Sequence, residues 1–487
     1  MKKIPWFLFL LVLFFCLHGS IENVGFIAAK EVVVVGLTVL AGVALLFGIS
    51  FLLFRKHYLL AALTSFFIAL WYIFFGALQD AIKNIGALTF LQRYTVIIPL
   101  LLLVTVAWVM ILKRKKAWQP KIALYLNVLL IIYCVIDTCM LAYHAMRFRQ
   151  KKMAPVAFDL SKVKATPNVY YLLFDEYPGY QSLADSFHYR NDSLYDFLKR
   201  EGFSMMPVFS NYNYTTYSIA SILNMQYVET GNSNIMVNQQ QIQQRLKEIR
   251  EAQVFPIFRS MGYRISNYSI FDIGDQQSIA AQNSFFPEHS RVLTDKLLHN
   301  RLIRDIGWWF AVGKWQVPFI RQRYLYHIDD NNKDAVKRLE QSLEEKNTAP
   351  RFCYAHLVLP HWPYFRDSSG KMRDIDQLRF TKSFSDKAAF ISYLKYAGTV
   401  MRSLVTKIVE HDPSGIVVVM SDHGFRSYAA QKVPYNYDNL CALRLPDQHY
   451  LPLAGKWSAV NFFRYLFNCE YGQQMPFIKD STFAITF

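Results

Sequence analysis

Long apolar runs dominate the first third of the chain. Each of five runs is close to the roughly 20 residues that an α-helix needs to cross the hydrocarbon core of a bilayer. The pattern therefore predicts an N-terminal transmembrane domain of about five helices within residues 1–150. The runs lie at about residues 5–20, 32–54, 58–78, 94–112 and 122–145.

From about residue 155 the pattern changes to short apolar runs that alternate with amphipathic stretches. Runs such as Val169–Phe174 and Ile416–Met420 are apolar throughout, which is typical of strands that are buried on both faces of a parallel sheet. Stretches such as Lys387–Glu410 have the length and periodicity of helices. We therefore expect residues 155–487 to form an α/β domain with a mostly parallel central sheet and helices on both faces.

The distribution of charge predicts the orientation of the chain in the membrane. The formal net charge is +17, and the first 154 residues account for +12 of it, with sixteen Lys and Arg against four acidic residues. The basic balance thus belongs to the membrane part, and a nucleic-acid partner is not needed to explain it. Lys and Arg gather before the first run, between the second and third, and between the fourth and fifth, which the positive-inside rule places in the cytoplasm. Residues from about 150 onward are then extracytoplasmic, although the cluster Arg147–Lys152 departs from the pattern.

Two features of the membrane part leave alternatives open. Met1–Ser20 also has the pattern of a signal peptide, with two lysines before a short apolar core. Cleavage there would leave four spans and the same orientation of the domain that follows. Asp137 is an acidic residue at membrane depth, which by default suggests a functional role. Beside Thr138 it also fits a hydrogen bond between helices, and we expect this structural role.

Polar groups follow the predicted strands at the points where the strands end. The carboxylates Asp175 and Glu176 follow the first of the two strands named above, and the tetrapeptide Ser421–Gly424 follows the second. Ligands of open α/β sheets bind beyond the carboxyl ends of the strands, where Asp422 and His423 offer an oxygen and a nitrogen to a metal ion. The tetrapeptide alone is equally compatible with an ordinary turn that carries a capping Asp and a surface His.

Two further segments place reactive groups at defined positions. Thr215 lies where a polar stretch becomes helix-periodic, so its hydroxyl is expected at a helix amino terminus, which favours an alkoxide and a bound anion. An ordinary Thr N-cap fits the same position equally well. His361 ends the strand-like run that starts at Phe352 and lies between prolines, where a His is suited to anion binding or general acid catalysis. His356 lies inside that run, and we expect it to be a core histidine with satisfied hydrogen bonds.

Taken together, these segments resemble the alkaline phosphatase superfamily. The resemblance is to its membrane-anchored sulfatase-like branch, which includes lipoteichoic acid synthases and lipid A phosphoethanolamine transferases. A multi-span helical anchor in front of an outward catalytic domain is similar to that branch as well. The matching motifs stand in the family's order over about residues 165–445. They are Pro167-Asn168-Val169 leading to Phe174-Asp175, Thr215-x-x-Ser218, Leu359-Pro360-His361-Trp362-Pro363-Tyr364 and Ser421-Asp422-His423-Gly424.

The resemblance implies one tightly bound divalent metal ion, for which Zn²⁺ and Mn²⁺ suit the mixture of oxygen and nitrogen ligands best. The implied metal ligands are Asp175, Thr215, Asp422 and His423. The implied catalytic residues are the nucleophile Thr215 and His361, which would lie near the transferred group. Further candidate positions are Glu176, which matches the second acidic position of sulfatases, Ser218 and Arg426.

The chain departs from the family's pattern in two respects. The sulfatase motif Cys-x-Pro-Ser-Arg is absent, because Thr215 stands at its position without Pro or Arg at the expected spacing. The disulfide-forming cysteines of phosphoethanolamine transferases are missing as well, since the six cysteines show no paired spacing. The first departure favours phosphoryl chemistry over sulfate ester hydrolysis.

Three functions are compatible with this sequence. The first is a metal-dependent enzyme that transfers or hydrolyses a phosphate-linked group, of the phosphoethanolamine or phosphoglycerol type, at the outer face of the cytoplasmic membrane. It would take the group from a membrane lipid donor to a lipid or glycan acceptor through phosphorylated Thr215. The second is a sulfatase that acts on sulfated glycans, and the third is a non-catalytic membrane sensor. Retention of all four metal-ligand positions argues against the third.

Overall fold

The computed structural model describes residues 5–83, 85–147, 153–229, 234–237, 239–280, 290–312, 317–321, 325–345, 348–378, 386–426, 433–452 and 455–486. The chain separates into two compact units. The first contains Met1–Lys151 and Gln282–Trp315, and the second contains Lys152–Ala281 and Gln316–Phe487. A segment from within the second unit's sequence therefore belongs to the first unit, which the expected division into residues 1–150 and 155–487 did not anticipate.

Helices form at each of the apolar runs of the first unit. Among the described residues, four of these helices are long and apolar enough to cross a membrane, whereas α1 is a shorter apolar helix of 17 residues. A fifth crossing by α1 stays a prediction. The helices are α1 (Trp6–Glu22), α2 (Ala29–Leu53), α3 (Tyr58–Lys83), α4 (Tyr94–Arg114) and α5 (Trp118–Arg147), with the 3-10 helix η1 (Gly86–Gln92) before α4. The segment from the later sequence adds α11 (Arg291–Thr294) and α12 (Leu298–Val312).

Asp137 forms a contact between two of these helices. Its side chain on α5 is buried, and its Oδ2 lies 3.2 Å from Nδ1 of His18 on α1. The Thr138 hydroxyl instead donates to the carbonyl oxygen of Cys134 on its own helix. The predicted hydrogen bond between helices is therefore confirmed, with His18 as the partner of Asp137.

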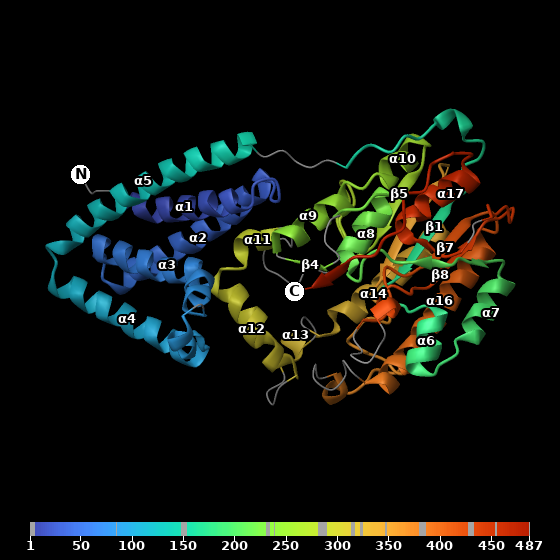
Figure 1. The fold of residues 1–487 in the computed structure, drawn as a ribbon. Helices are drawn as coiled ribbons and strands as arrows, with labels where there is room; N and C mark the ends of the chain where they lie inside the picture. The colour runs from blue at the N-terminus through green and yellow to red at the C-terminus, as the bar shows by residue number, and fades with distance from the viewer. Residues whose placement is uncertain are drawn as a thin grey trace. The chain divides into compact units, whose positions relative to one another are not determined.

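The described residues of the second unit form a six-stranded sheet in the order β2-β8-β7-β1-β6-β5 (Figure 1). The four strands β5, β6, β1 and β7 run parallel, whereas β8 is antiparallel to β7 and β2 is antiparallel to β8. This mostly parallel sheet confirms the predicted fold class. The strands are β1 (Val169–Phe174), β2 (Ser204–Met205), β5 (Arg264–Tyr268), β6 (Arg351–Leu357), β7 (Ile416–Met420) and β8 (Cys441–Arg444).

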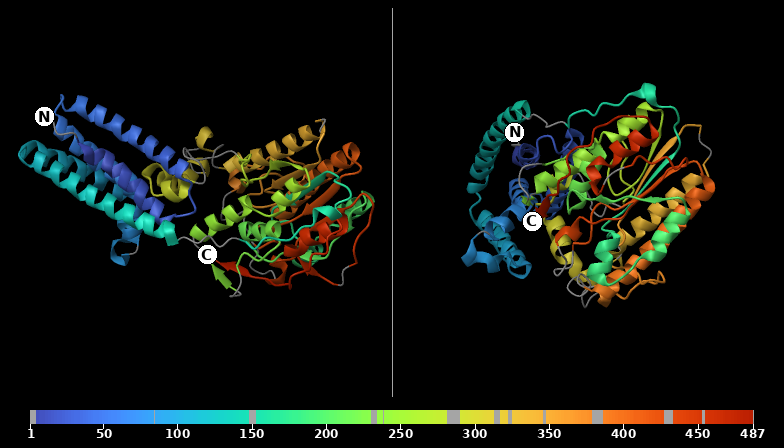
Figure 2. Two further views of the ribbon diagram at one scale, coloured as in Figure 1. Left: turned by 90° about the horizontal axis from the view of Figure 1, so that it is seen from above. Right: turned by 45° about the vertical axis from the view of Figure 1, so that its right-hand side comes forward.

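Helices cover both faces of this sheet (Figure 2). Helices α8, α10 and α17 share a core with one face, and α14 and α16 pack together on the other. Their bounds are α8 (Thr215–Asn224), α10 (Val254–Ser260), α14 (His327–Leu343), α16 (Lys387–His411) and α17 (Phe462–Glu470). Smaller elements are η2 (Leu160–Lys162), α6 (Tyr180–Phe187), α7 (Asp192–Arg200), β3 (Val208–Phe209), β4 (Asn234–Met236), α9 (Gln239–Arg250), α13 (Pro318–Arg321), η5 (Ile375–Leu378), η6 (Val433–Asn436), β9 (Trp457–Ser458), η7 (Ala459–Asn461) and β10 (Ala484–Thr486).

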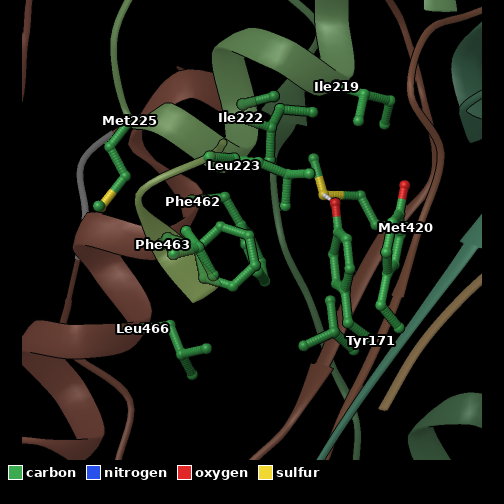
Figure 3. Packing of buried hydrophobic residues seen from close by; sticks show 14 of the residues in the cluster. Tyr171, Ile219, Ile222, Leu223, Met225, Met420, Phe462, Phe463 and Leu466 are labelled. Carbon is green, nitrogen blue, oxygen red and sulfur yellow. Dashed lines mark hydrogen bonds between the residues drawn. The ribbon is translucent and has the colours of Figure 1, made fainter. Parts of the chain in front are cut away.

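The core fixes α8 against the centre of the sheet (Figure 3). Ile219 and Ile222 of α8 are fully buried in one cluster with Tyr171 of β1 and Met420 of β7. Burial of an aliphatic side chain of this size stabilises the fold by about 1.5–3 kcal/mol. The first residue of α8, Thr215, therefore has a fixed position relative to the carboxyl ends of β1 and β7.

Candidate metal and catalytic site

Two neighbouring strands deliver ligand groups to one point. Asp175 follows β1, and Asp422 and His423 lie just beyond the end of β7. Because β1 and β7 are paired in parallel, their carboxyl ends meet at the same edge of the sheet. One ligand atom from each of these three buried residues lies within 4.8 Å of the others. The structure thus brings together the three side chains that the sequence proposes as charged or imidazole ligands.

Thr215 lies beside this cluster. Its Oγ1 is 3.3 Å from Nε2 of His423 and 3.5 Å from Oδ1 of Asp175. The N-cap of α8 is Tyr214, and Thr215 is the first residue inside the helix. The alternative that Thr215 is an ordinary N-cap is therefore wrong. Its hydroxyl points to the charged cluster at the positive end of the helix.

Backbone and side-chain hydrogen bonds hold the segment that follows β7. The N–H of Glu176 donates to Oδ1 of Asp422 at 2.9 Å, and the Ser218 hydroxyl donates to the carbonyl oxygen of Asp422 at 2.5 Å. Nδ1 of His423 donates a hydrogen bond to the carbonyl oxygen of Gly424 at 2.8 Å, because a carbonyl oxygen can only accept one. Nε2 of His423 is therefore left to bind a metal ion or accept a hydrogen bond. Ser218, one of the further candidates, has a positioning role here.

Gly424 is required by a close approach of two backbone segments. A Cβ atom at this position would lie 2.2 Å from the carbonyl oxygen of Tyr435 and 2.7 Å from that of Asp438. The N–H of Gly424 donates to the carbonyl oxygen of Asn436 at 2.9 Å. The absence of a side chain thus allows the two segments to pack closely next to His423.

Glu176 connects the remaining candidates. Its Oε1 accepts a hydrogen bond from the N–H of Arg426 at 3.0 Å, and its Oε2 lies 3.7 Å from Nε2 of His361. The Arg426 guanidinium donates to the carbonyl oxygen of Asn213 at 2.6 Å. Glu176 has a φ of +60°, which is uncommon for a residue with a side chain and is held here by its surroundings. Glu176 therefore binds His361 and Arg426 and lies outside the three-residue cluster.

His361 follows β6 and faces acidic groups. Burial lowers the pKa of His361, but the carboxylates of Asp175 and Glu176 outweigh this, and its pKa is raised above the usual range. Nδ1 of His361 lies 2.5 Å from the carbonyl oxygen of Trp362. The side chain is 27% exposed, so it is accessible to a substrate. A partly exposed His with a raised pKa suits a general acid.

His356 also belongs to this site, which the sequence analysis did not predict. It lies on β6, next to β1, and its Nε2 is 3.6 Å from Oδ2 of Asp175. Its Nδ1 lies 3.3 Å from the hydroxyl of Tyr354. Instead of a purely structural core histidine, it is a buried neighbour of a proposed metal ligand. The signal available in the sequence was its place inside β6, five residues before His361.

The electrostatics of the cluster favour a bound cation. Burial raises the pKa of Asp422, and the nearby Asp175 raises it further. Burial also raises the pKa of Asp175, but His361 and His356 outweigh this and keep it below its usual range. Oδ2 of Asp422 is buried and has no hydrogen-bond partner among the described residues. Two carboxylates, an imidazole nitrogen and an alcohol oxygen are a fitting set of donors for a divalent transition ion.

The strands of the central sheet and the side chains at the ends of β1 and β7 lie within the residues that a family model matches. The chain belongs to the sulfatase family, whose model, described as "Sulfatase", matches residues 167–458. No curated protein sequence matches the chain significantly.

Solved structures with similar folds share little sequence with the chain. The C-terminal periplasmic domain of EcEptC from Escherichia coli is 15% identical over 68% of this chain and 93% of that chain, with a TM-score of 0.41. The phosphonate monoester hydrolase SpPMH from Silicibacter pomeroyi is 13% identical over 65% of this chain and 75% of that chain, with a TM-score of 0.39. We assign the family from the sequence match alone, because these similarities are low.

Proposed function

We propose that the protein is a membrane-anchored, metal-dependent enzyme that transfers or hydrolyses a phosphate-linked group. The observation that carries the proposal is the position of the Thr215 hydroxyl, at a helix amino terminus and within 3.5 Å of both His423 and Asp175. A bare alcohol is a weak nucleophile, and these surroundings favour its deprotonated form. The group would be of the phosphoethanolamine or phosphoglycerol type and would pass from a membrane lipid to a lipid or glycan hydroxyl, or to water.

The proposed metal ligands are the residues that meet at the ends of β1 and β7. When bound, a Zn²⁺ or Mn²⁺ ion supplies positive charge that stabilises the alkoxide of the nucleophile and the oxygens of the transferred group. The residues that would hold it are Asp175, Thr215, Asp422 and His423. His356 would orient Asp175, and Ser218 would orient the backbone of Asp422.

The proposed reaction has two displacements. The Thr215 proton first leaves to solvent, and Oγ1 then attacks the phosphorus atom of a phosphodiester while the bond to the departing alcohol breaks. His361 donates a proton to the departing oxygen, for which its raised pKa is suited. The hydroxyl of the acceptor, or water, gives its proton to His361 and attacks the phosphorus of phosphorylated Thr215. The bond between phosphorus and Oγ1 of Thr215 breaks in this step, and Oγ1 takes a proton back from solvent. Thr215 and His361 are then restored.

The family match keeps sulfate ester hydrolysis as a second candidate function. Sulfatases of this superfamily use a cysteine or serine that is oxidised to an aldehyde hydrate. This chain has Thr215 at that position and lacks the surrounding motif. A non-catalytic role is disfavoured by the two buried carboxylates of the described site. Oδ2 of Asp422 has no hydrogen-bond partner there and lies 3.2 Å from Nε2 of His423, an arrangement that costs stability unless a cation binds.

Replacement of His361 is expected to affect substrates according to their leaving groups. His361→Gln should lower kcat by about 10²–10⁴-fold for an alkyl phosphodiester, because the alkoxide then leaves without a proton. The loss should be much smaller for a p-nitrophenyl phosphodiester, whose leaving group is stable as an anion. Steady-state kinetics with both substrates test this. Equal losses for both would assign His361 to substrate binding and not to general acid catalysis.

The orientation of the chain is tested with reporter fusions. We expect a fusion after Met153 to be active only with a reporter that folds outside the cytoplasm, because the loop charges place this point outside. A fusion after Lys116, between α4 and α5, is the matched control and should be active only with a cytoplasmic reporter. A cytoplasmic signal after Met153 would contradict the topology and, with it, a substrate in the cell envelope.

A further inference from the structure

Helices α11 and α12 pack on the ends of the membrane helices although they lie between β5 and β6 in the sequence. The buried side chains Leu293 and Leu297 belong to the apolar core of the first unit. A Cβ atom of Gly76 on α3 would lie 2.7 Å from Cα of Lys296, so glycine is required for this approach. The N–H of Gly76 donates to the carbonyl oxygen of Lys296 at 2.8 Å, just after the kink of α3 at Phe74.

Polar side chains of α12 fasten it to α3 and α4. Arg301 is almost fully buried and forms two hydrogen bonds with Asp80 of α3, at 2.8 and 2.7 Å. Tyr94, the first residue of α4, donates to Oδ2 of Asp305 at 2.7 Å. A buried arginine that binds a carboxylate through both oxygens fixes the orientation of the helix as well as its position.

A further polar contact joins the start of α12 to α3. The hydroxyl of Tyr72 on α3 lies 2.7 Å from Nδ1 of His299. Their rings are stacked, with centroids 5.7 Å apart. The side of α12 that faces the membrane helices is therefore polar and aromatic.

Three large apolar side chains of α12 are exposed. Ile303 is 41% exposed, Trp309 is 69% exposed and Phe310 is 37% exposed. Ile303 and Phe310 are seven residues apart and share one face of the helix, whereas Trp309 lies four residues after Asp305 and follows Arg301 and Asp305 along another face. A helix at the surface of a soluble protein buries its apolar face and exposes its polar face. In α12 the charged side chain of Arg301 is buried, while these three apolar side chains are exposed.

The position of α12 on the membrane helices suggests what covers these side chains. Its contacts Asp80 and Tyr94 lie at the end of α3 and the start of α4, on either side of the segment that the loop charges place outside the cytoplasm. Helix α4, which starts at Tyr94, exposes apolar side chains such as Leu102 and Leu103 along its length. The exposed apolar side chains of α12 thus belong to the same unit as a surface suited to lipid, and aromatic residues such as Trp309 are enriched at the membrane interface.

We propose that α12 lies in the interfacial layer of the outer leaflet, with the side chains of Ile303, Trp309 and Phe310 inserted between lipid headgroups and acyl chains. The bilayer is the partner of this surface, as it is for other amphipathic helices that lie in the membrane plane. The insertion does not depend on the proposed reaction, since none of these residues belongs to the catalytic site.

Fluorescence quenching of Trp309 in the full-length protein tests the proposal. The protein and its Trp309→Phe variant are reconstituted in phosphatidylcholine vesicles, and the difference between their spectra gives the signal of Trp309. We expect phosphatidylcholine brominated near the headgroup end of the acyl chain to remove most of this signal. Iodide in the aqueous phase should leave it almost unchanged. Trp309→Phe keeps an aromatic ring, so the helix and its contacts are retained.

The two quenchers separate the possible results. Quenching by iodide and not by the brominated lipid would place Trp309 in water and overturn the proposal. Protection from both quenchers would show that protein covers this face, either a second copy of the chain or another partner, and would also overturn it. An Arg301→Ala variant provides the matched control, because release of α12 from Asp80 should weaken quenching by the lipid while Trp309 is still present.

Discussion

Thr215→Ala should reduce turnover of a phosphodiester by about 10⁴-fold or more, because it removes the proposed nucleophile and one of the proposed metal ligands together. The fold should be retained, since the side chains of α8 that belong to the hydrophobic core start at Tyr217 and the Thr215 hydroxyl contacts site residues. Thr215→Ser should keep part of the activity, because it keeps the alcohol. Kinetics on a p-nitrophenyl phosphodiester and thermal unfolding measure both expectations.

The neighbouring Thr216 provides the control. Its hydroxyl is buried and has no hydrogen-bond partner in the described part of the chain, so Thr216→Ala should leave both activity and stability almost unchanged. Mass spectrometry after brief incubation with the phosphodiester should find the phosphorylated residue at position 215. A phosphorylated Thr216, or robust sulfatase activity in Thr215→Ala, would contradict the proposed mechanism.

Loss of the metal ion should have the second largest effect. Asp422→Asn is expected to lower metal occupancy and to reduce activity by about a thousand-fold or more, because a metal ion contributes several kcal/mol of transition-state stabilisation. In the wild-type protein, Zn²⁺ or Mn²⁺ at 100 times its dissociation constant should raise the free energy of unfolding by about 2.7 kcal/mol above that of the metal-free protein. Elemental analysis and thermal unfolding with and without added ion measure these effects.

Asp412→Asn is the matched control for this experiment. Asp412 is the same type of residue, but it precedes β7, whereas Asp422 follows it, and it accepts hydrogen bonds from Asn168 and Tyr170. The control should keep the metal ion and the activity. If Asp422→Asn together with His423→Ala bound the ion as well as the control does, the segment after β7 would not be a metal site.

The candidate site could be located from the sequence because strand ends are visible in it. The runs that became β1 and β7 are apolar at every position, which indicates strands in the middle of a parallel sheet, and such strands share one carboxyl edge. Asp175, Asp422 and His423 follow directly from this geometry. The helix that starts at Thr215 was visible as well, as a change from polar residues to an apolar periodicity.

Other parts could not be predicted because their causes lie far away in the chain. His356 differs from an ordinary core residue only by its distance from Asp175, which requires the pairing of β1 with β6. Thr215 was compatible with the N-cap position until the structure placed Tyr214 there. Helix ends shift by a residue or two without a clear local signal, so the length of α1 was uncertain too.

The association of α11 and α12 with the membrane helices could not be predicted either, because it depends on contacts between residues that are far apart in the sequence. Arg301 and its partner Asp80 are 221 residues apart, and Tyr72 and His299 are 227 residues apart. The periodicity of α12 identifies an amphipathic helix but does not indicate which side is covered. The residues of α3 and α4 that contact α12 could be identified only from the structure.

The origin of α12 in the later sequence affects how a soluble catalytic fragment has to be made. A fragment that starts just after α5 would still contain Leu293, Leu297 and Arg301, whose buried partners lie in the helices that had been removed. It would expose apolar surface and an unpaired arginine, and would tend to aggregate. Excision of residues 282–315, with a flexible link between the flanking segments, removes this surface along with the membrane helices. Limited proteolysis between α5 and β1 would, for the same reason, leave the catalytic unit attached to the membrane by two further peptide connections.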